Sequence, residues 1–224
     1  METQSLRRIA APATALLLSI GLSAQAPVAT RGSDHAPSEL APAVSAALAP
    51  GSISTASGDV PLEIWLAKGL PLEHAPAASG PVWRDVADGA LAGAIKVGAE
   101  WTDIRGFVVK PGVYTLRYAL QPANGDHMGV SPHREFLLMC PADADTTADP
   151  LGYDGAVKLA KQTVHRAHPS ALSVDPPSTT KELLSPVSND LGLEGFVLAV
   201  PTTFDGRDTG TITFGLILHG TIDA

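Results

Sequence analysis

The spacing of apolar and polar residues along the chain predicts a mainly β protein. The clearest alternation lies in the segment 113–120, where one set of side chains is Tyr114, Leu116, Tyr118 and Leu120 and the other is Val113, Thr115, Arg117 and Ala119. Successive side chains of a strand point to opposite faces of its sheet. The first set is therefore predicted to face the core, and Pro111-Gly112 before it predicts a tight turn.

Other apolar segments bounded by turn residues predict further strands. They span residues 62–68, 91–98, 105–110, 134–140, 193–204 and 211–222. The segment 134–140, "REFLLMC", is almost wholly apolar, as expected of a strand covered on both faces. The Asp- and Gly-rich "DGRDTG" (205–210) predicts a hairpin between the last two strands. Pro201 indicates an edge position or a bulge, because proline cannot donate to a ladder.

Helical spacing is confined to two short stretches. In "DGAVKLAKQTVHRAHP" (154–169) apolar residues recur at helical spacing, with Asp154 as the expected cap and Pro169 as the expected end. Thr179 and Glu182 have the spacing of a capping box and predict a second short helix. Short strands with one or two short helical insertions are typical of an antiparallel β-sandwich, immunoglobulin-like or transthyretin-like.

The N-terminal segments predict export of a single domain. Residues 1–26 combine Arg7 and Arg8 with an apolar stretch and small residues, as in a signal peptide. Residues 27–58 are rich in Ala, Pro and Ser and predict a flexible arm, with Pro42 interrupting any helix there. Residues 59–224 form the predicted domain, which is expected to be periplasmic or secreted. No segment of the predicted mature chain has the roughly 20 apolar residues of a membrane-spanning helix.

The charge of the chain argues against a nucleic-acid-binding protein, and its single cysteine excludes a protein stabilised by internal disulfides. The net charge of −8 becomes −9 once residues 1–26 are removed. Binding to a phosphate backbone depends on clustered Lys and Arg, so no nucleic-acid partner is expected. Cys140 is the chain's only cysteine. An internal disulfide is therefore impossible, and Cys140 is expected to be buried because unpaired cysteines usually are.

Candidate ligands gather between Gln121 and Pro141. The loop 121–134 contains Asp126, His127, Met128 and His133. Imidazole nitrogens and soft sulfurs together favour copper, and thiolate also suits zinc. Met139 and Cys140 would point to opposite faces of one strand. A blue-copper site, which needs two His and a Cys around one ion, fails on spacing because no histidine follows Cys140 until His165. The remaining alternatives are a ligand-binding loop using Asp126 and His127, or a copper or zinc site built from His127, His133, Asp126 and Met128.

Enzymatic activity has little support in the sequence. No G-x-S-x-G nucleophile motif, Walker phosphate loop or Rossmann glycine fingerprint is present. Asp85 and Asp88 could pair as acid and base, but the sequence gives no reason to place them in one cleft. Trp83 and Trp101 flank loops, where an exposed indole would indicate a sugar-stacking platform.

The segment 103–138 resembles a block of exported bacterial β-sandwich proteins with no established activity. That block pairs a "KPG-x-Y-T-L-R-Y" strand with a "G-D-H-x-G-x-S-P" turn and an "F-L-L" strand, and all three are present here. The resemblance covers about a sixth of the chain. It implies a periplasmic or secreted β-sandwich and points to Asp126 and His127 as candidate functional positions.

Three functions follow in order of preference. The first is a non-enzymatic domain that binds a small molecule or an envelope protein through the loop 121–134. The second is a copper- or zinc-binding protein of the cell envelope that uses His127 and His133. The third is a hydrolase of unknown substrate.

Overall fold

A computed structural model describes residues 28–122, 133–176 and 182–221 and shows a mainly β protein. From the N-terminus its elements are β1 (Thr30–Arg31), α1 (Pro42–Ala47), β2 (Ile53–Ser57), β3 (Val60–Leu66), β4 (Leu70–Pro71), the 3-10 helix η1 (Trp83–Asp85), β5 (Leu91–Val97), β6 (Trp101–Thr102), β7 (Val108–Val109), β8 (Gly112–Leu120), β9 (Glu135–Pro141), α2 (Gly152–Val164), β10 (Ala171–Asp175), β11 (Pro186–Ser188), β12 (Glu194–Phe204) and β13 (Arg207–His219). The prediction of strands with one or two helical insertions is confirmed.

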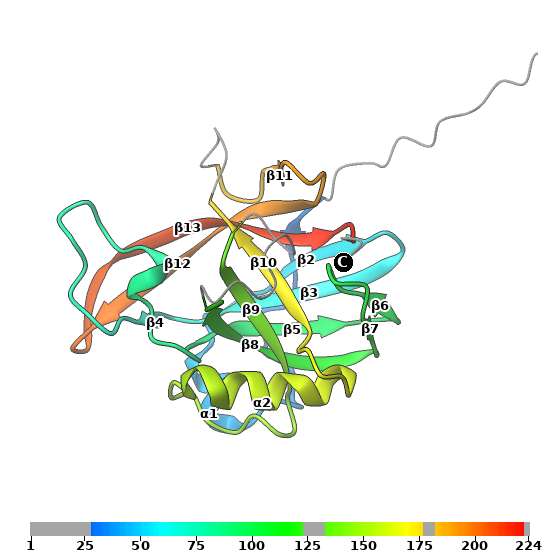
Figure 1. The fold of residues 1–224 in the computed structure, drawn as a ribbon, viewed down its shortest axis with the longest axis horizontal. Helices are drawn as coiled ribbons and strands as arrows, with labels where there is room; N and C mark the ends of the chain where they lie inside the picture. Colours follow the sequence, from blue (N-terminus) through cyan, green and yellow to red (C-terminus); the bar gives the residue numbers. More distant parts are fainter. Residues whose placement is uncertain (1–27, 123–132, 177–181, 222–224) are drawn as a thin grey trace, which may run out of the picture.

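Most strands belong to one eleven-stranded sheet (Figure 1). The order along it is β1-β2-β3-β5-β8-β9-β10-β13-β12-β11, with β4 paired to β12; β6 and β7 form a separate small sheet. The β4–β12 pair is parallel, whereas every other strand pair in the described part of the chain is antiparallel. The sheet is therefore mixed and not wholly antiparallel as predicted.

The sheet curls so that distant strands share one apolar core. Side chains from β3, β5 and β8 pack in the same cluster as those from β12 and β13. Ser57 Oγ at the end of β2 donates a hydrogen bond of 3.0 Å to the Leu218 carbonyl of β13, which joins two strands far apart in the sheet order. The alternation predicted for β8 is confirmed, because Leu116 and Tyr118 lie in this core.

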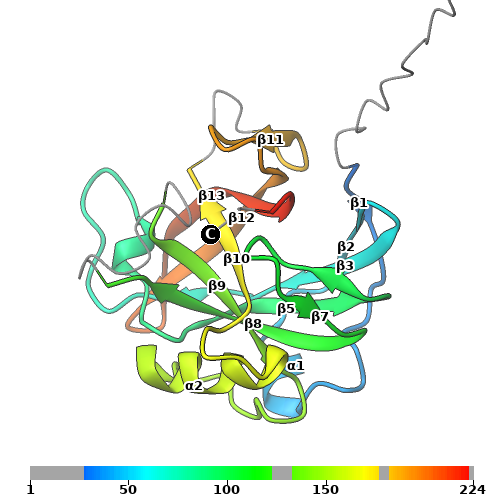
Figure 2. The same ribbon diagram turned by 45° about the vertical axis from the view of Figure 1, so that its right-hand side comes forward.

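The two helices cover the outer face of the sheet (Figure 2). Ala156 and Ala160 of α2 pack on Leu138 and Cys140 of β9. Met139 lies in the inner core instead, so the prediction that the sulfurs of Met139 and Cys140 point apart is confirmed. Strand β9 is buried on both faces, as its apolar sequence indicates.

The predicted flexible arm is wrong for residues 28–58. This segment contains β1, α1 and β2, and β1 and β2 are part of the main sheet. Val44 and Leu48 are buried against Trp65 on the outer face of the sheet. Pro42 does not interrupt α1 but begins it, where the missing N–H costs no helical hydrogen bond. The domain therefore begins before residue 59.

The ends of α2 also differ from the sequence prediction. The helix starts at Gly152, which places Asp154 in its first turn and not at the cap. It ends at Val164, five residues before Pro169, because His165 adopts the left-handed conformation (φ 51°) that terminates helices. The second predicted helix is absent from residues 182–184, which form a turn; its first residues lie outside the described ranges.

The C-terminal hairpin forms as predicted. Strands β12 and β13 pair antiparallel along their length and are joined through Asp205 and Gly206, both with positive φ. Pro201 is exposed and lies one residue before a register shift in β12, in agreement with the predicted bulge. No helix within the described ranges is long and apolar enough to cross a bilayer.

Candidate functional site

A cleft lies beside the start of β9. Its volume is about 580 Å³. Four segments meet around it: the loop carrying η1, the residues that enter β9, the end of β10 and the middle of β13. These segments are far apart in the sequence; β9, β10 and β13 are brought together because they are neighbours in the sheet, and the loop carrying η1 joins them.

Trp83 forms the aromatic wall of the cleft. Its ring stacks on Tyr118 at 5.2 Å between centroids, with 21° between the planes. It also meets Phe214 edge to face at 5.1 Å. The short helix η1 presents the indole because Asp85 Oδ2 accepts a hydrogen bond of 3.0 Å from the Val82 N–H and closes the turn. Trp83 is only half-buried, whereas Trp65 and Trp101 are buried.

Two polar atoms in this aromatic cluster have no hydrogen-bond partner among the described residues. They are the Trp83 Nε1 and the Tyr118 hydroxyl, and both are shielded from solvent. An unsatisfied buried donor costs about 1–3 kcal/mol, so such groups need an explanation. Burial, followed by the charges of Glu135 and Asp88, raises the pKa of Tyr118, while Arg84 and Arg134 oppose that rise. Since three of these charged residues line the cleft, the phenol lies close to it.

The rim of the cleft combines basic, acidic and hydroxyl groups. Arg134 Nε donates to the Gln121 carbonyl at 2.7 Å, and the Arg134 N–H donates to Glu135 Oε2 at 3.0 Å. These contacts fix the two residues that enter β9. Arg84 of η1 is exposed and also lines the cleft. Thr211 and Thr213 of β13 add two hydroxyl groups.

Two carboxylates that the sequence suggested as a catalytic pair do not line this cleft. Asp85 is engaged in the η1 turn. Asp88 lies nearby, and its pKa is raised by partial burial and by Glu73, with the Leu120 N–H opposing the shift. The carboxylate and imidazole among the described lining residues are those of Glu135 and His133.

The structure places one of the four predicted site residues. His133 is half-buried and lines the cleft, and it also borders a smaller cavity of about 160 Å³ next to Asp175 and Asn189. The other three residues, Asp126, His127 and Met128, lie outside the described residues. Within the described ranges no three His, Cys, Asp or Glu residues gather as metal ligands would. The copper or zinc hypothesis stays a prediction.

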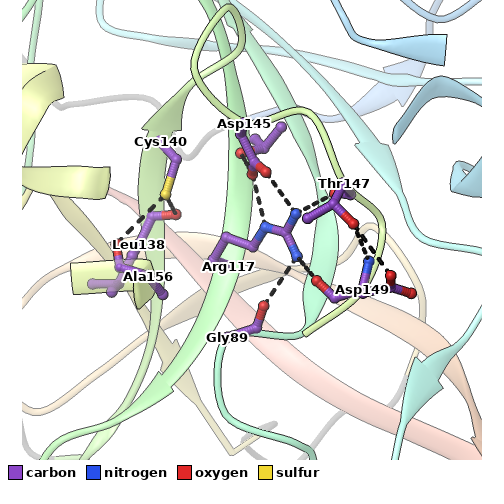
Figure 3. A network of polar contacts seen from close by, with 9 residues as sticks. Gly89, Arg117, Leu138, Cys140, Asp145, Thr147, Asp149 and Ala156 are labelled. Atoms are coloured by element: carbon purple, nitrogen blue, oxygen red, sulfur yellow. Dashed lines mark hydrogen bonds and ion pairs between the residues drawn. The ribbon is translucent and has the colours of Figure 1, made fainter. Parts of the chain in front are cut away.

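Sequence reasoning missed a buried ion pair on the outer face of β8 (Figure 3). Arg117, on the outer face of β8, is fully buried and forms two hydrogen bonds of 2.7 Å with the Asp145 carboxylate. Its remaining N–H groups donate to backbone carbonyls of Gly89, Thr147 and Asp149. The alternation in β8 identified its outer face, but nothing in the local sequence indicated an acidic partner 28 residues away.

The Arg117–Asp145 pair has a structural role. It holds the segment 145–149 and the turn at Gly89 against β8, and the Thr115 hydroxyl also binds Asp145.

Burial, followed by the nearby Asp145 charge, raises the pKa of Cys140 to about 12. A thiol with such a pKa remains protonated at neutral pH and is a poor metal ligand or nucleophile.

Comparisons with known proteins identify no relative. No family model, no curated protein and no solved structure matches this chain. The resemblance of residues 103–138 to exported β-sandwich proteins therefore stays a prediction from the sequence.

Proposed function

We propose that this chain is an exported, non-enzymatic binding domain that takes a small ligand in the cleft lined by His133 and Arg134. The observation that carries the proposal is the half-buried Trp83, held by Tyr118 and Phe214 at the wall of a cleft of about 580 Å³. Small-ligand sites are typically concave clefts with apolar or aromatic walls and a few polar groups. Export to the periplasm or the medium rests on the leader-like residues 1–26.

The proposed architecture is a variant of the antiparallel β-sandwich, immunoglobulin-like or transthyretin-like. Its support is the single core shared by β3, β5 and β8 on one side and β12 and β13 on the other. In such an arrangement the ligand contacts loops at one end while the packed sheet holds them in place.

The chemistry of the cleft favours a ligand with a ring and several hydroxyl groups, such as a saccharide. An aromatic wall packs against the apolar face of a sugar ring, and polar groups around it exchange hydrogen bonds with the hydroxyls. Arg84 supplies donors, Glu135 supplies acceptors, and Thr211 supplies both.

Isothermal titration calorimetry with a panel of mono- and disaccharides tests this proposal. We expect one of them to bind and to change the fluorescence of Trp83, the half-buried indole. Arg84→Gln removes charged donors from an exposed position and should weaken binding roughly tenfold, the equivalent of about 1.4 kcal/mol. Trp83→Leu should abolish binding while thermal unfolding confirms that the domain still folds.

Arg207→Gln is the matched control, because Arg207 is equally exposed but lies at the tip of the β12–β13 hairpin. It should bind like the unmodified protein. Unchanged affinity in Arg84→Gln and Trp83→Leu, or the absence of any saccharide with a Kd below about 1 mM, would contradict the proposal.

A further inference from the structure

A second groove lies on the opposite face of the sheet from the cleft, beneath α2. Its volume is about 260 Å³, and its floor consists of Phe136, Leu138 and Ala171. Phe136 and Leu138 point to the outer face of β9, whereas Leu137 between them lies in the inner core. The sheet therefore separates this groove from the Trp83 cleft, and the two can be tested independently.

Basic side chains stand at the edge of this apolar groove. Arg105, Lys161 and His168 line it from three directions: the β6–β7 turn, the last turn of α2 and the segment after α2. The chain as a whole has a net charge of −8. A cluster of basic groups beside an apolar floor is thus a local departure from the overall charge of the molecule.

Arg105 has Asp103 as a charged neighbour, whose effect opposes the lowering of its pKa, but the two form no ion pair in the described part of the chain. Its guanidinium lies 5.6 Å above the Phe107 ring, and partial burial lowers its pKa. The nearest carboxylate, Asp103, already accepts hydrogen bonds from the backbone N–H groups of Arg105 and Phe107 and from the Ser170 hydroxyl. No hydrogen bond or ion pair of the Arg105 guanidinium is found among the described residues, so its donors are available to a ligand.

Apart from Asp103 beside Arg105, the acidic groups that act on residues lining the groove lie toward the start of α2. Asp154 and Asp88 are the charges that act on Tyr153, whose pKa is raised first by burial. Tyr153 lines one end of the groove, whereas Lys161 follows two turns later in the helix. The anionic group of a bound ligand is therefore expected near Arg105 and Lys161, away from Asp154 and Asp88.

We propose that this groove binds a small amphiphilic monocarboxylate. Its apolar chain or ring lies on Phe136 and Leu138, and its carboxylate pairs with Arg105 and Lys161. Charge-assisted hydrogen bonds from a guanidinium to a carboxylate are among the strongest in proteins, particularly beside an apolar surface that excludes water. The inference does not rest on the proposed saccharide site.

Calorimetry with octanoate and with 4-phenylbutyrate tests the inference and separates an acyl chain from an aryl ring. At least one should bind with a Kd below about 1 mM, while octanol, which has the same chain without the charge, should bind at least tenfold more weakly. Arg105→Gln combined with Lys161→Gln should weaken carboxylate binding by tenfold or more. Ala167→Trp, at an exposed lining position, should block the groove.

Lys158→Gln is the matched control, since Lys158 is exposed on α2 but does not line the groove. Lys161 also lies where a cation stabilises the negative end of a helix. If that were its only role, the double variant would unfold at a lower temperature while its affinity for the carboxylates stayed unchanged. Any one of three results would overturn the inference. They are unchanged carboxylate affinity in the double variant, equal affinity for octanol and octanoate, and no binding of either carboxylate.

Discussion

Replacing Arg117 by methionine tests how the outer layer is held to the sheet. The guanidinium is fully buried and makes two hydrogen bonds of 2.7 Å to Asp145, with others of 3.0 Å and 2.9 Å to the carbonyls of Gly89 and Asp149. Arg117→Met keeps much of the side-chain volume but leaves the buried Asp145 carboxylate with the Thr115 hydroxyl alone. The variant therefore leaves a buried charge unpaired and also removes the donors to the carbonyls of Gly89, Thr147 and Asp149.

The expected loss is about 3–5 kcal/mol of unfolding free energy, the usual cost of removing one partner of a buried ion pair. For a domain of this size that is a large part of the total stability. Asp145→Leu should lower the unfolding free energy by a similar amount, because it leaves the buried Arg117 guanidinium without its anionic partner. The double variant should be less destabilised than the sum of the two single variants, since it leaves no unpaired charge.

Urea unfolding followed by circular dichroism measures all three variants, with the exposed Arg207→Met as the control that should stay within about 0.5 kcal/mol. A loss below about 1 kcal/mol for Arg117→Met would refute the reasoning. So would strict additivity in the double variant, because it would mean that the two charges do not interact.

Three further predictions concern buried groups. Cys140, with its pKa raised to about 12, should react with a thiol reagent at pH 8 only as fast as the protein unfolds, and rapid reaction of the native protein would contradict its burial. Gly93→Ala should cost several kcal/mol in thermal unfolding, because a Cβ there would lie 2.2 Å from the Trp65 carbonyl oxygen. Burial raises the pKa of Asp103 above its unfolded value of 3.8, so ionisation of this carboxyl opposes folding. The unmodified protein should therefore lose stability relative to Asp103→Asn as the pH rises from 3.8 through the folded-state pKa, and a pH-independent difference would contradict this sign.

The sequence by itself determined those features that depend on neighbours along the chain. Alternation in β8 assigned Leu116 and Tyr118 to the core, and the same two-residue period separated Met139 from Cys140. Asp205-Gly206 specified the turn between β12 and β13. In each case the backbone geometry of a strand or turn fixes the side-chain direction within a few residues, so a local pattern is sufficient.

Only the tertiary structure decided the features that depend on distant partners. Composition suggested that residues 27–58 were unfolded, yet Val44 and Leu48 find an apolar surface at Trp65, which offsets the entropy of ordering that segment. Arg117 is buried because Asp145 and three carbonyls complete its hydrogen bonds. The Trp83 cleft exists because the loop carrying η1 joins β9, β10 and β13, which are neighbours in the sheet. Such contacts join residues tens of positions apart, and no short-range pattern encodes which of them will meet.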